Sequence, residues 1–139
     1  MERLEDCISF LVRKAAQQIS LRAREMLASW NVTPAQYAVL KALWAEDGQS
    51  GAAIGARLVI DSAATTRMID RLESSGLLKR RAVVGDRRVH LLFLTTQGRA
   101  LRVPLDAAMN ELNAEVDAAL HDLAPAVREA LRRVGEVRK

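Results

Sequence analysis

The chain has 139 residues, half of them hydrophobic and 27% charged, which is enough for one domain with its own core. Aromatic residues make up only 4%, so we expect a core built from Leu, Val, Ile and Ala. No apolar run approaches the length of a bilayer-spanning helix, and the acidic first residues are unlike a secretory signal. A single cysteine, Cys7, excludes an internal disulfide and a cysteine-rich metal site. These features predict a cytoplasmic protein with no cofactor, no metal and no membrane partner.

The positive charge is concentrated in one segment. Residues 57–88 carry eight Lys or Arg against four Asp or Glu, whereas residues 1–56 and 89–139 are each balanced, so this segment holds the whole net charge of +4. A polyanion is the natural partner of such a segment. The alternative is a solvated charged surface without a partner.

Residues 3–30 are predicted to form one long helix. Apolar side chains recur at steps of three and four, at Leu4, Ile8, Leu11, Ala15, Ile19, Ala23, Met26, Leu27 and Trp30. Such a helix would be about 40 Å long, which is more than a small domain can cover. An uncovered apolar stripe predicts a partner chain.

Three shorter helices follow, over residues 34–46, 51–58 and 62–75. Thr33-Pro34-Ala35-Gln36 is a strong helix start, since Thr33 can cap, proline suits the first position and Gln36 can return a hydrogen bond. Asp61 or Ser62 is expected to cap the third helix, with Met68, Ile69 and Leu72 facing inward and Gly76 ending it.

The hydrophobic period then changes to two. Residues 78–84 and 89–94 are predicted strands, and Gly85-Asp86-Arg87-Arg88 is the expected hairpin tip. A long helical region begins near residue 95, with a kink expected at Pro104, and a last helix opens at Ala124-Pro125. The order is typical of a winged helix-turn-helix, in a mostly α fold with a small β-hairpin wing.

This arrangement predicts contacts with double-stranded DNA. The helix over 62–75 is slim enough to enter a major groove, and the hairpin tip can place arginines in the narrow minor groove beside it. Lys79, Arg80 and Arg81 at the hairpin base are expected to contact phosphates. In addition to Arg80, the candidate DNA-binding residues are Ser62, Thr65, Thr66, Arg67, Arg71, Lys79, Arg81, Arg87 and Arg88.

The sequence resembles the MarR family of bacterial regulators over residues 33–100, without a gap. The resemblance is carried by Thr33-Pro34-Ala35-Gln36-Tyr37, Leu58-Val59-Ile60-Asp61, Thr66-Arg67-Met68-Ile69-Asp70-Arg71-Leu72-Glu73, Gly76-Leu77-Leu78, Asp86-Arg87-Arg88 and Leu94-Thr95-Thr96-Gln97-Gly98. It implies a homodimer held by the first helix and the last two, a pseudo-palindromic operator and, usually, repression. Residues 1–30 and 96–139 would then form the helical dimerisation region, and residues 31–95 the DNA-binding lobe, associated with the nucleoid when bound. Ala63, Ala64 and Val59 depart from the family pattern, which leaves fewer polar groups for reading base edges.

The resemblance also implies an effector pocket between the dimerisation helices and the lobe, for a phenolic or aryl carboxylate or its thioester. Arg13 could pair with the carboxylate, and the other candidates for its lining are Ser9, Phe10, Tyr37 and Trp44. The alternative for the aromatic residues is plain core packing, and for Arg13 a surface charge.

Other functions remain as alternatives. Cys7 could make the protein a thiol-based redox sensor of the same fold, with Arg3 and the helix start stabilising the thiolate, or it could be a bystander. The winged helix could instead bind another protein. We expect no enzyme and no catalytic residues, because neither His90 nor His121 has partners for a zinc or acid–base site, and no phosphate-binding glycine loop is present.

Overall fold

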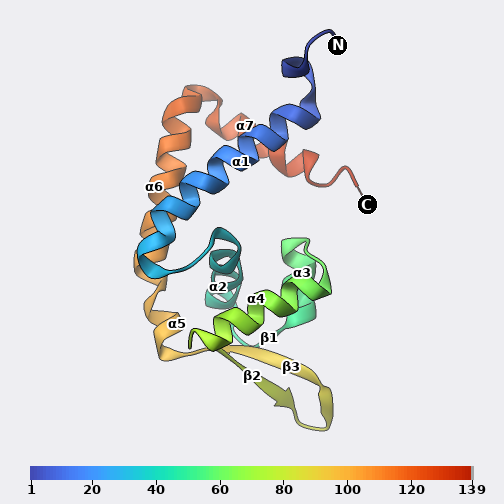
Figure 1. Cartoon of the computed structure of the whole chain (residues 1–139), viewed down its shortest axis with the longest axis vertical. Helices are drawn as coiled ribbons and strands as arrows, with labels where there is room; N and C mark the ends of the chain where they lie inside the picture. The colour runs from blue at the N-terminus through green and yellow to red at the C-terminus, as the bar shows by residue number, and fades with distance from the viewer. Residues whose placement is uncertain (139) are drawn as a thin grey trace.

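The computed structural model describes residues 1–138 and has two parts (Figure 1). The long helices α1, α6 and α7 lie on one side, and α2, α3, α4 and a small sheet form a lobe on the other. The elements are a 3-10 turn at Leu4–Asp6, α1 (Ile8–Leu27), a 3-10 turn at Ala28–Trp30, α2 (Pro34–Ala45), β1 (Gln49–Ser50), α3 (Gly51–Leu58), α4 (Ser62–Ser74), β2 (Leu78–Val83), β3 (Asp86–Leu94), α5 (Thr96–Ala100), α6 (Arg102–Leu120), a 3-10 turn at His121–Leu123 and α7 (Ala124–Val134). The predicted mostly α fold with a β-hairpin wing is confirmed.

The lobe has a core made largely of aliphatic side chains. Leu40 and Leu43 from α2 meet Ile54 from α3 and Leu72 from α4, and none of the four is exposed to solvent. Leu105 joins the same cluster from α6, so the core continues from the lobe into the long helices. Each such side chain contributes about 2 kcal/mol through burial, which makes this cluster the main stabilising feature of the lobe.

The predicted helix starts are present as hydrogen bonds. Thr33 Oγ1 accepts from the Gln36 N–H at 3.1 Å, and Gln36 Oε1 accepts from the Thr33 N–H at 3.0 Å, which is a complete capping box. Asp61 rather than Ser62 caps α4, because its Oδ1 accepts from the Ala64 N–H at 2.7 Å. These caps fix where the helix-turn-helix begins.

Two of the predicted helices are broken. Residues 3–30 do not form one helix, since Cys7 is extended between the first turn and α1, and the last three residues, Ala28–Trp30, form a 3-10 turn. The late helical region breaks at Leu101, between α5 and α6, close to the kink expected at Pro104. Pro104 explains that break, because its ring has no N–H to donate and would clash with the carbonyl of Ala100.

The apolar stripe of α1 is largely uncovered in the single chain. Ala23 and Leu27 are buried against the lobe and α6, whereas Ile8 is 69% exposed and Leu11 is 42% exposed. Arg22 holds α1 to α6 through two hydrogen bonds to the Glu115 carboxylate, at 2.7 and 2.9 Å. No helix within residues 1–138 is both long enough and apolar enough to span a membrane.

The sheet has the order β1-β3-β2 and is antiparallel throughout. Its short strand β1 was not predicted, because two residues are too few to show a period. The hairpin turn is also tighter than expected: β3 already begins at Asp86, so Val84 and Gly85 alone turn the chain, with Gly85 at φ +92°. Arg87 and Arg88 therefore lie in the first residues of β3, next to the turn.

Val59 has an unfavourable backbone conformation. It ends α3 at φ +56°, ψ +48°, where a β-branched side chain is strained, and its side chain is 89% exposed. We expect Val59→Gly to raise the free energy of unfolding by about 1 kcal/mol, after allowing for the greater freedom of glycine in the unfolded chain. Urea denaturation of the two proteins measures this difference. Val84→Gly, at another exposed valine, is the control and should not stabilise the protein.

Candidate nucleic-acid interface

The outer face of α4 is polar and unobstructed. Ile69 and Leu72 bury the opposite face of the helix, so Ser62, Thr66 and Arg67 point to solvent. Arg71 lies one turn beyond Arg67 on the same exposed side. Among residues 1–138, neither arginine takes part in an ion pair, and both guanidinium groups are free to bind an anion.

Thr65 lies on the other side of the helix, and the prediction that it faces DNA is wrong. Its side chain is only 4% exposed, and its hydroxyl donates to the Asp61 carbonyl at 2.8 Å. The reason is helical spacing, because Thr65 precedes Ile69 by four residues and so shares its buried face. A Cβ at Gly55 would lie 2.8 Å from Thr65 Oγ1, so Thr65 instead sets the close packing of α3 on α4.

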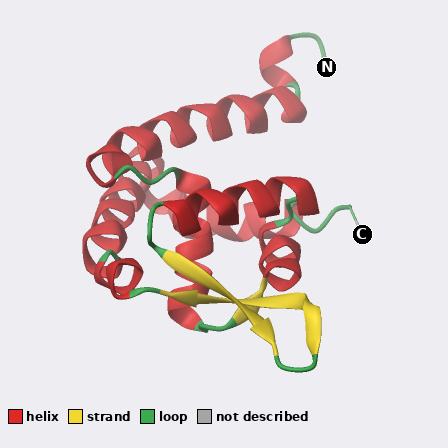
Figure 2. Ribbon diagram, turned by 60° about the horizontal axis from the view of Figure 1, so that its bottom comes forward, coloured by secondary structure: helices red, strands yellow, loops and turns green. Residues whose placement is uncertain are grey.

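The wing and α4 share one concave face. A hollow of about 320 Å³ is lined by Thr66 from α4 and by Arg80, Arg88 and His90 from the wing, and also by Ser50, Gly51, Ala52, Ile69, Val89 and Leu92. Arg88 has 92% of its side chain exposed and only a 3.5 Å contact with Asp86. Figure 2 shows the hairpin extending past α4 into solvent. A rod-shaped polyanion could therefore contact helix and wing together.

Arg80 has a structural role, contrary to the prediction that it contacts phosphate. Its guanidinium bonds Glu73 at 2.9 Å and Asp70, both on α4, and its backbone N–H donates to the second oxygen of Glu73 at 2.9 Å. The side chain is only 25% exposed. Arg80 therefore fixes the position of the wing relative to α4, and its charge is already neutralised.

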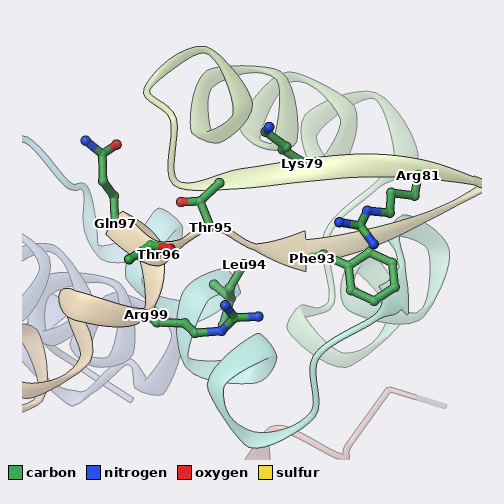
Figure 3. A pocket seen from close by; sticks show the side chains of 8 residues that line it. All are labelled: Lys79, Arg81, Phe93, Leu94, Thr95, Thr96, Gln97 and Arg99. Atoms are coloured by element: carbon green, nitrogen blue, oxygen red, sulfur yellow. The ribbon is translucent and has the colours of Figure 1, made fainter.

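Lys79 and Arg81 lie on the opposite face of the sheet. They alternate with Arg80 along β2, and Lys79 pairs with Phe93 of β3. The Arg81 guanidinium lies 5.0 Å from the centre of the Phe93 ring. Both side chains line a separate hollow (Figure 3), so the structure does not bring them together with Arg88 and Thr66.

The predicted effector residues form two separate groups. Tyr37 donates to Asp106 Oδ1 at 2.8 Å, and Trp44 donates to the Gly98 carbonyl at 3.0 Å, with the two rings packed edge to face at 5.9 Å. The other group, Ser9, Phe10 and Arg13, lies in the first half of α1, which extends away from α2 in Figure 1. One chain alone therefore does not assemble this pocket.

Asp106 joins the lobe to the long helix α6. Its carboxylate accepts from the Tyr37 hydroxyl and, at 2.9 Å, from the Lys41 ammonium, both on α2. Burial alone would raise the pKa of Asp106, but the hydrogen bonds from Lys41 and Tyr37 outweigh it and lower the pKa overall. Burial, followed by the bond to Asp106, raises the pKa of Tyr37. This contact was not predicted, because it joins residues far apart in sequence.

We expect Asp106→Asn to destabilise the protein by about 1 kcal/mol at pH 7, since the charged hydrogen bond with Lys41 is lost. A carboxylate with a lowered folded-state pKa stabilises the fold above its unfolded pKa, and this contribution disappears as pH falls through the folded value. The difference in free energy of unfolding between the two proteins should therefore begin to narrow below about pH 4 and go on shrinking as the pH falls. Urea denaturation between pH 3 and 7 measures it, and a gap independent of pH would contradict the assignment.

The remaining candidates form no site in this structure. Cys7 is half-buried at the start of α1, and Arg3 pairs with Asp6 at 3.3 Å. No group of three or more His, Cys, Asp or Glu among residues 1–138 is placed to hold a metal ion. His121 follows the last residue of α6 with φ +54°, and His90 lines the hollow between α4 and the wing.

Known proteins resemble the chain in sequence. The model described as MarR family matches residues 32–90. The regulator TtmR of Methylorubrum extorquens is 38% identical over 105 residues, which cover 76% of this chain but only 54% of TtmR. The regulator SarZ of Staphylococcus saprophyticus is 30% identical over 121 residues, covering 84% of this chain and 83% of SarZ. Both are named HTH-type transcriptional regulators, and neither name describes an enzyme.

Solved structures share the whole fold. PcaV of Streptomyces coelicolor, solved with its natural ligand, is 28% identical with a TM-score of 0.87, and the match covers all of this chain and 99% of PcaV. The repressor CouR bound to a 23-mer DNA duplex is 31% identical with a TM-score of 0.76, over 96% of this chain and 93% of CouR. The chain belongs to the MarR family of winged-helix transcriptional regulators.

Proposed function

We propose that the protein is a ligand-responsive regulator that binds a pseudo-palindromic DNA operator as a homodimer and, in the usual mode of its family, represses transcription. The concave face shared by α4 and the wing carries the proposal. Thr66 and Arg88 border one hollow from two different elements, and unpaired Arg67 and Arg71 continue the positive surface along α4. We assign Ser62 and Arg87, both exposed, to the same interface. This charge and shape suit a helix in the major groove with a wing beside it.

The uncovered apolar side chains on the long helices support the dimer. Ile8 and Leu11 on α1 and Leu131 and Val134 on α7 are between 42% and 69% exposed. A second copy of the chain would bury them, and two-fold pairing is the commonest arrangement of soluble oligomers. In this proposal residues 1–30 and 96–139 form the dimerisation region, and residues 31–95 form the lobe that binds DNA.

We further propose a small aromatic effector, a phenolic or aryl carboxylate or its thioester. The indole N–H of Trp44 and the hydroxyl of Tyr37 are already bonded within the chain, which leaves their rings for apolar contact. Arg13 has no ion-pair partner among residues 1–138, so its guanidinium can donate to a carboxylate once a second copy brings α1 close to the lobe. The proposal is supported by PcaV, a transcriptional regulator of similar fold that was solved in complex with its natural ligand.

The test is a titration of purified protein into labelled DNA from upstream of its own gene. If each subunit neutralises three or four phosphates, the affinity should fall with a log–log salt slope of about −5 to −7. The footprint should contain two half-sites about 10 base pairs apart. The function is wrong if no specific retardation occurs and the protein is monomeric at micromolar concentration. A thermal-shift screen of aromatic acids, phenols and their thioesters then tests the effector, and a hit must also release DNA.

A further inference from the structure

The hollow on the outer face of the wing sheet has unused positive charge. It measures about 460 Å³ and is lined by Lys79, Arg81, Phe93, Leu94, Thr95, Thr96, Gln97 and Arg99. Three of these eight side chains are cations and none is acidic. Its lining includes no residue of α4 and neither Arg87 nor Arg88, so it is separate from the hollow assigned to DNA.

The cations of this hollow are poorly neutralised by the chain itself. None of the ion pairs within residues 1–138 includes Lys79 or Arg81. Arg99 has only a 3.4 Å contact with Asp47, whose other oxygen already accepts the Leu94 N–H at 2.9 Å. Like charges gathered around one hollow repel one another, so an anion bound among them would relieve that repulsion.

The hollow also has a flat surface. The Arg81 guanidinium lies 5.0 Å from the centre of the Phe93 ring, and Figure 3 shows the two groups next to each other. In the same view Arg81 and Arg99 reach towards the middle of the hollow from opposite ends. Thr96 adds an exposed hydroxyl at the rim. A planar ring can pack against Phe93 while an anionic group bonds the arginines.

We propose that this hollow binds a free small molecule that carries phosphate groups and a planar ring, such as a nucleotide. Phosphate fits better than carboxylate, because a site with three cations and no acid favours a ligand with more than one negative charge. The volume lies within the range of small-molecule pockets. The site acts independently of operator binding, and its ligand is distinct from the aromatic effector proposed above.

The probe is ADP, with inorganic pyrophosphate as the ligand without a ring, and binding is measured by isothermal titration calorimetry. We expect ADP to bind the intact protein more tightly than pyrophosphate does. The double variant Arg81→Gln, Arg99→Gln should weaken ADP binding at least tenfold. The matched control is Arg87→Gln, which removes an exposed wing arginine outside the hollow and should change ADP binding less than twofold.

Operator titrations show whether the hollow binds a free ligand or the phosphates of the DNA duplex. Arg99→Gln should weaken ADP binding while leaving operator affinity within twofold of the parent protein. The proposal is overturned if neither probe binds at millimolar concentration, if ADP binding survives the double variant, or if Arg87→Gln abolishes it. It is also overturned if Arg99→Gln weakens operator binding as strongly as Arg87→Gln does, because the hollow would then belong to the DNA interface. ADP binding without any operator binding would contradict only the proposed function.

Discussion

Replacing Arg87 and Arg88 together with alanine is expected to weaken operator binding by at least about 100-fold at 100 mM salt. A specific arginine contact to DNA is worth about 1–3 kcal/mol, and a dimer would lose four such side chains. The salt dependence should change as well, with the log–log slope shallower by about three to four if all four cations neutralise phosphates. Titrations at several salt concentrations, with both proteins on the same duplex, measure the two effects.

The loss should come from the interface and not from the fold. The Arg88 side chain is 92% exposed and its only ion pair within residues 1–138 is with Asp86, so the thermal midpoint should stay within about 2 °C of the parent value. Arg132 and Arg133 on α7 provide the control, since they are another adjacent pair of exposed arginines outside the lobe. Both contact Glu129 and lie beside the proposed dimer face, so size-exclusion chromatography must show that this variant is still a dimer. Replacing them with alanine removes the same charge and should leave operator affinity within a few-fold.

The same pair of variants separates DNA binding from the alternative of a protein-interaction module. If the winged helix served only to bind another protein, neither pair of arginines would affect affinity for the duplex beyond a general charge effect. Equal losses for the wing pair and the α7 pair would therefore contradict the assignment of Arg87 and Arg88 to the interface. A loss confined to the wing pair supports it.

The sequence was most informative where local chemistry decides local structure. The capping box at Thr33 and the boundaries of α3 follow from neighbouring residues, and the structure has both as predicted. It was less informative where a distant partner decides. Arg80 and Arg81 are adjacent in a basic run, yet one is neutralised by α4 and the other lies over the Phe93 ring, because a strand alternates its side chains between two faces.

In the candidate site, too, local features could be predicted from the sequence and contacts between distant segments could not. The period of α4 correctly placed Ile69 and Leu72 inward, and the same period would have placed Thr65 with them had it been applied to polar residues too. The link from Tyr37 and Lys41 to Asp106 joins segments at least 65 residues apart and has no local signal. The two groups of predicted effector residues stay apart within one chain, and how a second copy would position them is not encoded in either helix alone.

Gly98→Ala is expected to destabilise the lobe by about 3 kcal/mol or more, a large part of the stability of an ordinary domain. A Cβ at this position would lie 2.1 Å from the Leu77 carbonyl oxygen and 3.3 Å from Leu94. The first of these atoms belongs to the backbone and is held in place, because the Leu77 carbonyl accepts from the Thr95 N–H at 3.2 Å. The clash can be relieved only by moving α5 away from the start of the hairpin.

That movement should affect more than stability. The Gly98 carbonyl accepts from the Trp44 indole at 3.0 Å, and its N–H donates to Thr95 Oγ1 at 3.1 Å, so one residue joins α2, α5 and the sheet. We expect urea denaturation to show the lower free energy of unfolding and operator titrations to show weaker binding, since the wing would shift relative to α4. Gly135→Ala is the control, because a Cβ there meets only carbonyls at 3.4 Å and the residue already has helical geometry. If Gly98→Ala is as stable as Gly135→Ala, α5 does not lie as close to the Leu77 carbonyl as described. The account of how the wing is anchored to the lobe would then be wrong as well.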